Sequence, residues 1–145
     1  LNANAAEVNT NLGMVALIEG NVADAENYLA KGTDSEANAA ALGNLYVAQG
    51  QYERAVSAFG ETKSNAAALA QIMAEQYTAA NNTLDAVENA DAYTYYLKAI
   101  VGARTNKAAA VAENLVKAAK LDRSIVERAK KDMEFKKFAA ALLNL

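Results

Sequence analysis

An internal repeat is the feature of this sequence that most constrains its fold. Residues 42–55 (LGNLYVAQGQYERA) align without a gap on residues 12–25 (LGMVALIEGNVADA), at an offset of 30. Each segment begins with Leu-Gly, has a second glycine seven residues after the first, and has an alanine five residues after that. One such unit is too small to bury its apolar face alone and is stabilised by stacking on its neighbours. The repeat therefore predicts a stacked array.

Two looser copies follow. Residues 77–87 align with residues 46–56 at an offset of 31, and the fourth copy covers residues 95–122. Alanine and asparagine stand in these copies where the first two have glycine: Ala74 and Asn81 in the third, Ala99 and Asn106 in the fourth. Glycine and asparagine tolerate the left-handed conformation that ends a helix. Each repeat is therefore predicted to be two helices joined at that residue.

Small residues recur where two helices must approach closely. We expect Ala25, Ala55 and Ala86 to let each second helix pack tightly on its first helix. Glycine inside a helix costs about 0.5–1 kcal/mol relative to alanine, so its presence in the Leu-Gly pairs indicates close approach of another backbone. The larger Leu29 and Phe59, four residues further on, are expected to fill the space between neighbouring helix pairs.

The composition supports an all-α fold. The chain has no proline and 36 alanines among 145 residues, and alanine is the best helix former while proline is the worst. Apolar periodicity and capping residues predict helices near residues 4–19, 22–31, 35–49, 52–62, 65–80, 83–90, 92–104, 107–120 and 123–141. The last helix starts with Ser124 and Glu127 in capping-box spacing. Asp132 is a candidate residue for starting a new helical turn in its middle. Its apolar stripe would be Ile125, Ala129, Met133 and Phe138.

These features resemble the tetratricopeptide repeat (TPR) family over about residues 5–122. The likeness lies in Leu-Gly, in Tyr46 and Tyr77, in the turn, and in the alanine and aromatic residue of the second helix. It implies a right-handed α-α superhelix of about four helical hairpins, with a single domain over residues 1–145. The repeats would be 5–34, 35–65, 66–91 and 92–122, followed by a capping helix at 123–145. The chain departs from the family in its spacing of about 30 residues, its lack of helix-ending proline and its small residues at the usual tryptophan position of repeats one to three.

The family resemblance also implies a concave groove lined by the first helix of each pair. Counted from the Leu-Gly positions, the candidate partner-binding residues are Asn44, Gln71, Glu75, Tyr93, Tyr96 and Arg104. An extended peptide would be held by Asn44 and Gln71, with an apolar side chain against the two tyrosines. The alternative interpretation places both tyrosines in the core between repeats. A clamp for acidic peptide termini is disfavoured, because Glu7 and Glu75 would repel a carboxylate.

The residue types exclude several classes of enzyme. The chain has no cysteine and no histidine, which excludes thiolate metal sites, cysteine nucleophiles and serine–histidine chemistry. Its seven glycines are scattered singly and form no phosphate-binding loop. Together with the TPR resemblance, these exclusions predict a non-catalytic protein-interaction scaffold with no cofactor and no metal. The net charge of −3 disfavours a nucleic-acid ligand.

Charge is unevenly distributed along the chain. Residues 1–91 carry 3 basic and 12 acidic residues, and residues 92–145 carry 11 basic and 5 acidic. This asymmetry favours either two solvated faces of opposite sign or self-association between copies. The alternative function is thus a structural spacer or self-assembly module of a larger bacterial cell-envelope protein. A textural likeness to TPR regions of OmpA-like envelope proteins favours the periplasm or envelope over the cytoplasm. A start at Leu1 and the lack of a long apolar run favour an excised segment without a transmembrane span.

Overall fold

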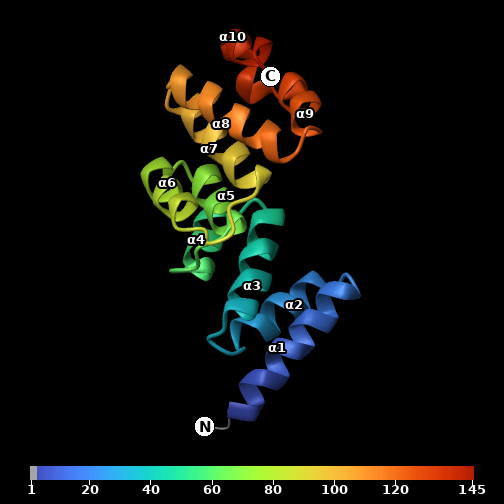
Figure 1. Cartoon of the computed structure of the whole chain (residues 1–145). Helices are drawn as coiled ribbons and strands as arrows, with labels where there is room; N and C mark the ends of the chain where they lie inside the picture. The colour runs from blue at the N-terminus through green and yellow to red at the C-terminus, as the bar shows by residue number, and fades with distance from the viewer. Residues whose placement is uncertain (1–2) are drawn as a thin grey trace. The chain divides into compact units, whose positions relative to one another are not determined.

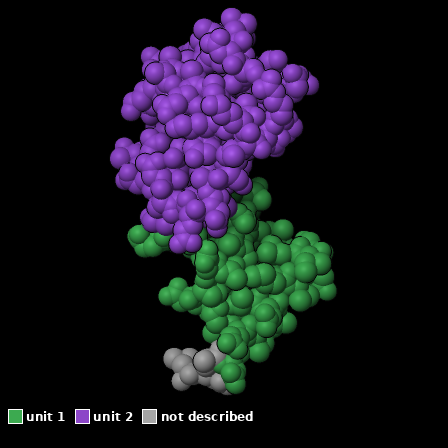
Figure 2. Space-filling view, viewed as in Figure 1, with its two compact units in different colours: residues 1–62 green, residues 63–145 purple. Residues whose placement is uncertain are grey.

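The computed structural model describes residues 3–145, and every regular element in that range is helical. The all-α prediction is therefore confirmed. The chain divides into two compact units, Leu1–Thr62 and Lys63–Leu145 (Figures 1 and 2). The division falls close to the boundary predicted between the second and third repeats. Within residues 3–145, no helix has both the length and the apolar character needed to cross a membrane.

Unit 1 consists of two helical hairpins. Their helices are α1 (Ala3–Ile18) with α2 (Val22–Ala30), and α3 (Glu36–Ala48) with α4 (Tyr52–Phe59). The helices of each pair pack against one another, and α2 also contacts α3. Leu45 of α3 joins Ala16 and Ala25 of the first hairpin in a buried cluster. The Ser35 hydroxyl caps α3 by accepting a hydrogen bond from the backbone N–H of Asn38 at 3.2 Å.

Unit 2 contains two further hairpins and a C-terminal helical segment. The hairpins are α5 (Asn65–Met73) with α6 (Tyr77–Asp85), and α7 (Ala92–Arg104) with α8 (Ala108–Leu121). The segment that follows comprises α9 (Ile125–Lys131), the 3-10 helix η1 (Met133–Phe138) and α10 (Ala139–Leu143). All three of these short elements pack on α8, and η1 also contacts α7. The predicted capping role of residues 123–145 agrees with this packing.

All four hairpins turn at a residue in the left-handed region. These residues, with their φ angles, are Gly20 (78°), Gly50 (71°), Glu75 (61°) and Asn106 (57°). In each turn the next residue donates its backbone N–H to a carbonyl five residues earlier: at Gln51 the acceptor is the Tyr46 carbonyl, at 2.8 Å. This is the hydrogen bond of a Schellman motif, which satisfies carbonyls at the end of the first helix. One turn geometry therefore builds every hairpin.

A small residue in each first helix faces a large residue in its second helix. A Cβ added at Gly43 would lie 2.5 Å from the ring of Phe59, and one added at Gly13 would lie 2.5 Å from the side chain of Leu29. Ala68 and Leu84 meet in one buried cluster of unit 2. Leu29 and Phe59 thus fill space within their own hairpins, contrary to the expectation that they lie between hairpins.

The third repeat was aligned wrongly from the sequence. The helix expected at 65–80 ends at Met73, and the turn is at Glu75 instead of Asn81. Ala68 therefore takes the place expected for Ala74, and Ala80 takes the place expected for Ala86. Leu84 takes the place that Phe59 has in the second hairpin. Because α5 has 9 residues where α3 has 13, its turn at Glu75 lies six residues before the expected position at Asn81.

The C-terminal helix is also interrupted. The expected helix 123–141 stops at Lys131, and Asp132 then caps η1 by accepting the backbone N–H of Glu134 at 3.0 Å. The fresh start at Asp132 is confirmed. Ser124 does not cap α9 with its side chain; its hydroxyl instead donates to the Asp122 carboxylate at 2.7 Å.

The expected apolar stripe of this segment is only partly right. Ile125, Ala129 and Phe138 are buried, but Met133 is 72% exposed. Phe135 takes the buried place and packs edge-on against Tyr96, with ring centroids 5.4 Å apart. The change from α-helix to 3-10 helix after Asp132 changes the direction in which the following side chains point, so that Phe135 faces the core and Met133 faces solvent.

Candidate functional site

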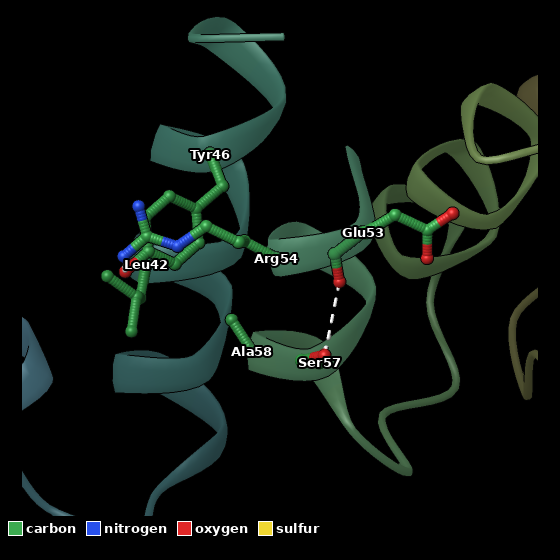
Figure 3. A pocket seen from close by; sticks show the side chains of 6 residues that line it. All are labelled: Leu42, Tyr46, Glu53, Arg54, Ser57 and Ala58. Carbon is green, nitrogen blue, oxygen red and sulfur yellow. Dashed lines mark hydrogen bonds between the residues drawn. The ribbon is translucent and has the colours of Figure 1, made fainter. Parts of the chain in front are cut away.

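A depression of about 440 Å³ lies on the α3–α4 hairpin of unit 1 (Figure 3). Its lining residues come from both helices: Leu42 and Tyr46 from α3, and Glu53, Arg54, Ser57 and Ala58 from α4. Leu42 and Ala58 supply apolar surface, and Arg54 supplies the positive charge. The Schellman turn at Gly50 sets the two helices side by side and so brings these residues together.

Arg54 is the chemical centre of this depression. Its guanidinium lies 4.2 Å from the centroid of the Tyr46 ring. It donates hydrogen bonds to the Tyr46 hydroxyl at 2.8 Å, to Glu26 Oε1 at 2.8 Å and to Gln51 Oε1 at 2.6 Å. Its side chain is nevertheless 53% exposed. The guanidinium is therefore held in one place while keeping a solvent-facing surface.

Tyr46 and Glu26 fix the position of Arg54. The Tyr46 hydroxyl also donates to Glu26 Oε1 at 3.4 Å, which links α2 to α3. Burial raises the pKa of Tyr46, and the neighbouring Glu26 carboxylate raises it further while Arg54 lowers it. Tyr46 is therefore a neutral hydrogen-bonding partner at physiological pH. Cation–π contacts of this kind contribute about 0.5–1 kcal/mol at exposed sites.

The remaining polar groups of the depression are directed elsewhere. The Ser57 hydroxyl donates to the backbone carbonyl of Glu53 at 3.1 Å. Figure 3 shows the carboxylate of Glu53 extending away from the Arg54–Tyr46 pair. The face of the depression toward Leu42 therefore combines apolar carbon with one fixed cationic donor. Such a surface suits binding of an apolar group next to a hydrogen-bond acceptor.

Unit 2 has a larger depression, of about 550 Å³, where the start of α7 meets α8 and α9. Its lining residues are Ala90, Asp91, Ala92, Tyr93, Leu121, Asp122, Ile125 and Arg128. The guanidinium of Arg128 lies 5.6 Å from the Tyr93 ring centroid. Asp91 caps α7, and the hydrogen bond from the Thr94 backbone holds the pKa of this carboxyl below its usual value. Two carboxylates and one cation share this depression, so its lining carries a net negative charge.

The structure places the six predicted site residues in different settings. Asn44 is exposed on α3 of unit 1, and the other five belong to unit 2. Glu75 is exposed at the α5–α6 turn, while Gln71 is partly buried with an Oε1 atom that accepts no hydrogen bond. Tyr93 is half-buried and lines the depression of unit 2.

Tyr96 and Arg104 make contacts within unit 2 and do not line an open groove. Tyr96 has no exposed surface, and its hydroxyl donates to Asp132. Tyr96 is thus a core residue, but it lies in the cluster between the last hairpin and the C-terminal segment, not between two repeats, and it lines no open groove. Arg104 donates to Glu134 Oε1 through Nε at 3.0 Å and to the backbone carbonyl of Ile72 at 3.2 Å. This residue links α5, α7 and η1.

Arg54 and Tyr46 are not among the candidate residues expected from the sequence. A signal existed, because Arg54 stands in the second repeat where the first has Asp24, and it is one of three basic residues in the first 91. A reversal of charge at an otherwise matched position marks a repeat that differs in surface chemistry. Among residues 3–145, no three carboxylates gather in a way that could hold a metal ion.

Comparisons with models of protein families, with curated proteins and with solved structures find no match to this chain.

Proposed function

We propose that this chain is a non-catalytic protein-interaction module built from TPR-like helical hairpins. In this proposal it binds an extended segment of a protein partner at the α3–α4 depression. The observation that carries the proposal is the half-exposed side chain of Arg54, fixed against Tyr46 beside the apolar surface of Leu42 and Ala58. Rigid amphipathic anchors of this kind bind with little loss of side-chain entropy.

The charge of unit 1 indicates the chemistry of the partner segment. Residues 1–62 carry 2 basic and 8 acidic residues, so their field attracts a basic segment, repels an acidic one and does not oppose a neutral one. An apolar side chain of the segment would pack against Leu42 and Ala58. A backbone carbonyl next to it would accept a hydrogen bond from Arg54, because carbonyl oxygens bind guanidinium groups without adding negative charge.

A peptide-display selection on the whole chain tests this proposal. We expect enriched peptides to share an apolar anchor and to be depleted in Asp and Glu. Binding of the best peptide, followed by fluorescence anisotropy, should weaken about tenfold in Arg54→Lys. Lysine keeps the charge but loses the planar stack and the fixed donors, and a lost charge-assisted hydrogen bond is worth about 1.5–3 kcal/mol.

Arg123→Lys is the matched control, because Arg123 is an exposed arginine of unit 2 outside both depressions. Its affinity for the peptide should equal that of the wild type. Equal affinities for all three proteins, or enrichment of acidic peptides, would count against the proposed site. Circular dichroism spectra that coincide for the three proteins exclude unfolding as the reason for weaker binding.

A further inference from the structure

The first helix, α1, has both a buried and an exposed set of apolar residues. One face packs on α2 through Gly13 and Ala16, which are buried. The other carries large apolar side chains that remain exposed: Val8 (53%), Leu12 (41%), Val15 (48%) and Ile18 (87%). These four residues, here named the α1 stripe, recur at helical spacing and form one surface strip. A helix that is apolar all round is normally covered on both sides.

The equivalent face of later hairpins is covered by a neighbouring hairpin. The repeat places Leu45 and Val101 at the position of Val15, and they are only 6% and 1% exposed. Leu45 packs on Ala16 and Ala25 of the hairpin before it. Val101 likewise packs in a cluster with Ala68 and Ile72 of the hairpin before it. The α1 stripe therefore has the chemistry of a helix–helix interface, and no residue in the range 3–145 covers it to the same degree.

Charge indicates which partner fits the stripe. Acidic residues border it and the turn that follows: Glu7, Glu19 and Asp24 are all exposed. At the other end of the sequence, Met133 and Leu143 are 72% and 85% exposed. They lie in a segment whose exposed lysines are Lys130, Lys131, Lys136 and Lys137. The C-terminal segment 130–143 thus offers apolar side chains among positive charges, which complements apolar side chains bordered by negative ones.

We propose that the α1 stripe of one molecule binds the C-terminal segment 130–143 of a second copy. The contact is heterologous, because two different surfaces meet. One copy of the pair keeps its C-terminal segment unused, and the other keeps its α1 stripe unused. Such contacts close into rings or extend into chains. This inference rests on different residues from the proposed peptide site, and Arg54→Lys should leave it unchanged.

Sedimentation velocity over a wide concentration range provides the first test. We expect the wild type to associate with increasing concentration, and less at 500 mM than at 50 mM salt, because salt screens exposed charges (Debye length about 10 Å at 0.1 M). The double variant Val15→Arg/Ile18→Arg should remain a monomer. Thr78→Arg is the control. It also adds a positive charge at an exposed position within the acidic residues 1–91, and it should associate like the wild type.

Mixing two defective variants tests the head-to-tail geometry. The stripe variant Val15→Arg/Ile18→Arg keeps its C-terminal segment, and the variant Lys136→Glu/Lys137→Glu/Leu143→Glu keeps its stripe. Each alone should be monomeric, and an equimolar mixture should give a 1:1 heterodimer that grows no further. A wild type that stays monomeric at every concentration, or a mixture without heterodimer, would overturn the proposal.

Discussion

At the scale of single residues, the left-handed turn position decides where each hairpin reverses. The first two turns use glycine and the fourth uses asparagine. The third turn uses Glu75, with a φ of 61°. A glutamate pays a steric cost of about 1–2 kcal/mol in this conformation. The third turn was expected at Asn81 instead of Glu75, because glutamate, unlike glycine or asparagine, does not indicate the left-handed region. The dipeptide Gln76-Tyr77 does match Gln51-Tyr52 after the Gly50 turn, and that match gives the correct register.

Replacement of Glu75 by glycine should therefore stabilise unit 2 by about 1 kcal/mol, since glycine adopts positive φ without a steric cost. Urea unfolding followed by far-UV circular dichroism measures the change. Glu75→Gln is the control: it removes the charge near the C-terminal end of α5 but keeps the Cβ, so it isolates the effect of charge on the helix dipole. Equal gains from glycine and glutamine would show that strain at this position is negligible.

The contact between Gly43 and Phe59 gives a second prediction at this scale. Gly43→Ala places a Cβ about 2.5 Å from the Phe59 ring, and overpacking of this kind costs about 1–3 kcal/mol. Phe59→Leu in the same chain should restore part of the stability, because alanine faces leucine in the Ala68–Leu84 cluster. A double-mutant cycle in urea measures the coupling. Additive effects of the two substitutions would contradict direct contact between these residues.

At the scale of the elements, caps and breaks explain the differences between expected and observed helices. The sequence predicted the helix at 92–104 correctly, because Asp91 and Thr94 form a capping box at its start. It indicated the break at Asp132 but not the 3-10 helix that follows, because a switch to 3-10 geometry depends on tertiary partners. Tyr96 binds Asp132, and Phe135 enters the core beside it. No local pattern in residues 123–141 specifies those long-range contacts.

The Asp91 cap predicts a pH dependence of stability. Its carboxylate accepts the Thr94 backbone N–H at 2.9 Å, which lowers the pKa of Asp91 below its ordinary value of 3.8. A lowered folded-state pKa means that the stabilisation is fully present above the unfolded-state pKa and is lost as the pH falls through the folded-state value. Asp91→Ala should therefore cost about 1 kcal/mol at pH 7 and less near pH 3.

Asp91→Asn is the control for that measurement. Asparagine still caps a helix by accepting a backbone hydrogen bond, but it does not titrate. Its stability relative to the wild type should change between pH 7 and pH 3 in the same direction as that of the alanine variant, while its loss at pH 7 is smaller. Thermal unfolding across this range provides the comparison. An alanine penalty that stays constant with pH would show that the charge of Asp91 contributes nothing.

At the scale of the whole molecule, the helical-hairpin organisation followed from the sequence more readily than the site did. The repeat predicted the two hairpins of unit 1 and the last hairpin of unit 2, since their turns contain glycine or asparagine. The candidate site depends on the triad of Glu26, Tyr46 and Arg54, which lie up to 28 residues apart. The sequence-based choice of groove residues used only first helices. Arg54 lies on a second helix and was therefore overlooked.

The measurement that most directly tests binding at the α3–α4 depression is an amide and guanidinium NMR titration of the whole chain with the best selected peptide. Binding at this depression should shift the resonances of Tyr46, Arg54 and Ser57, with the Arg54 side-chain resonance moving most. Shifts confined to Asn44, Gln71 and Glu75 would support the surface expected from the sequence instead. Shifts elsewhere, with the resonances of the depression unmoved at saturating peptide, would rule out binding at this site.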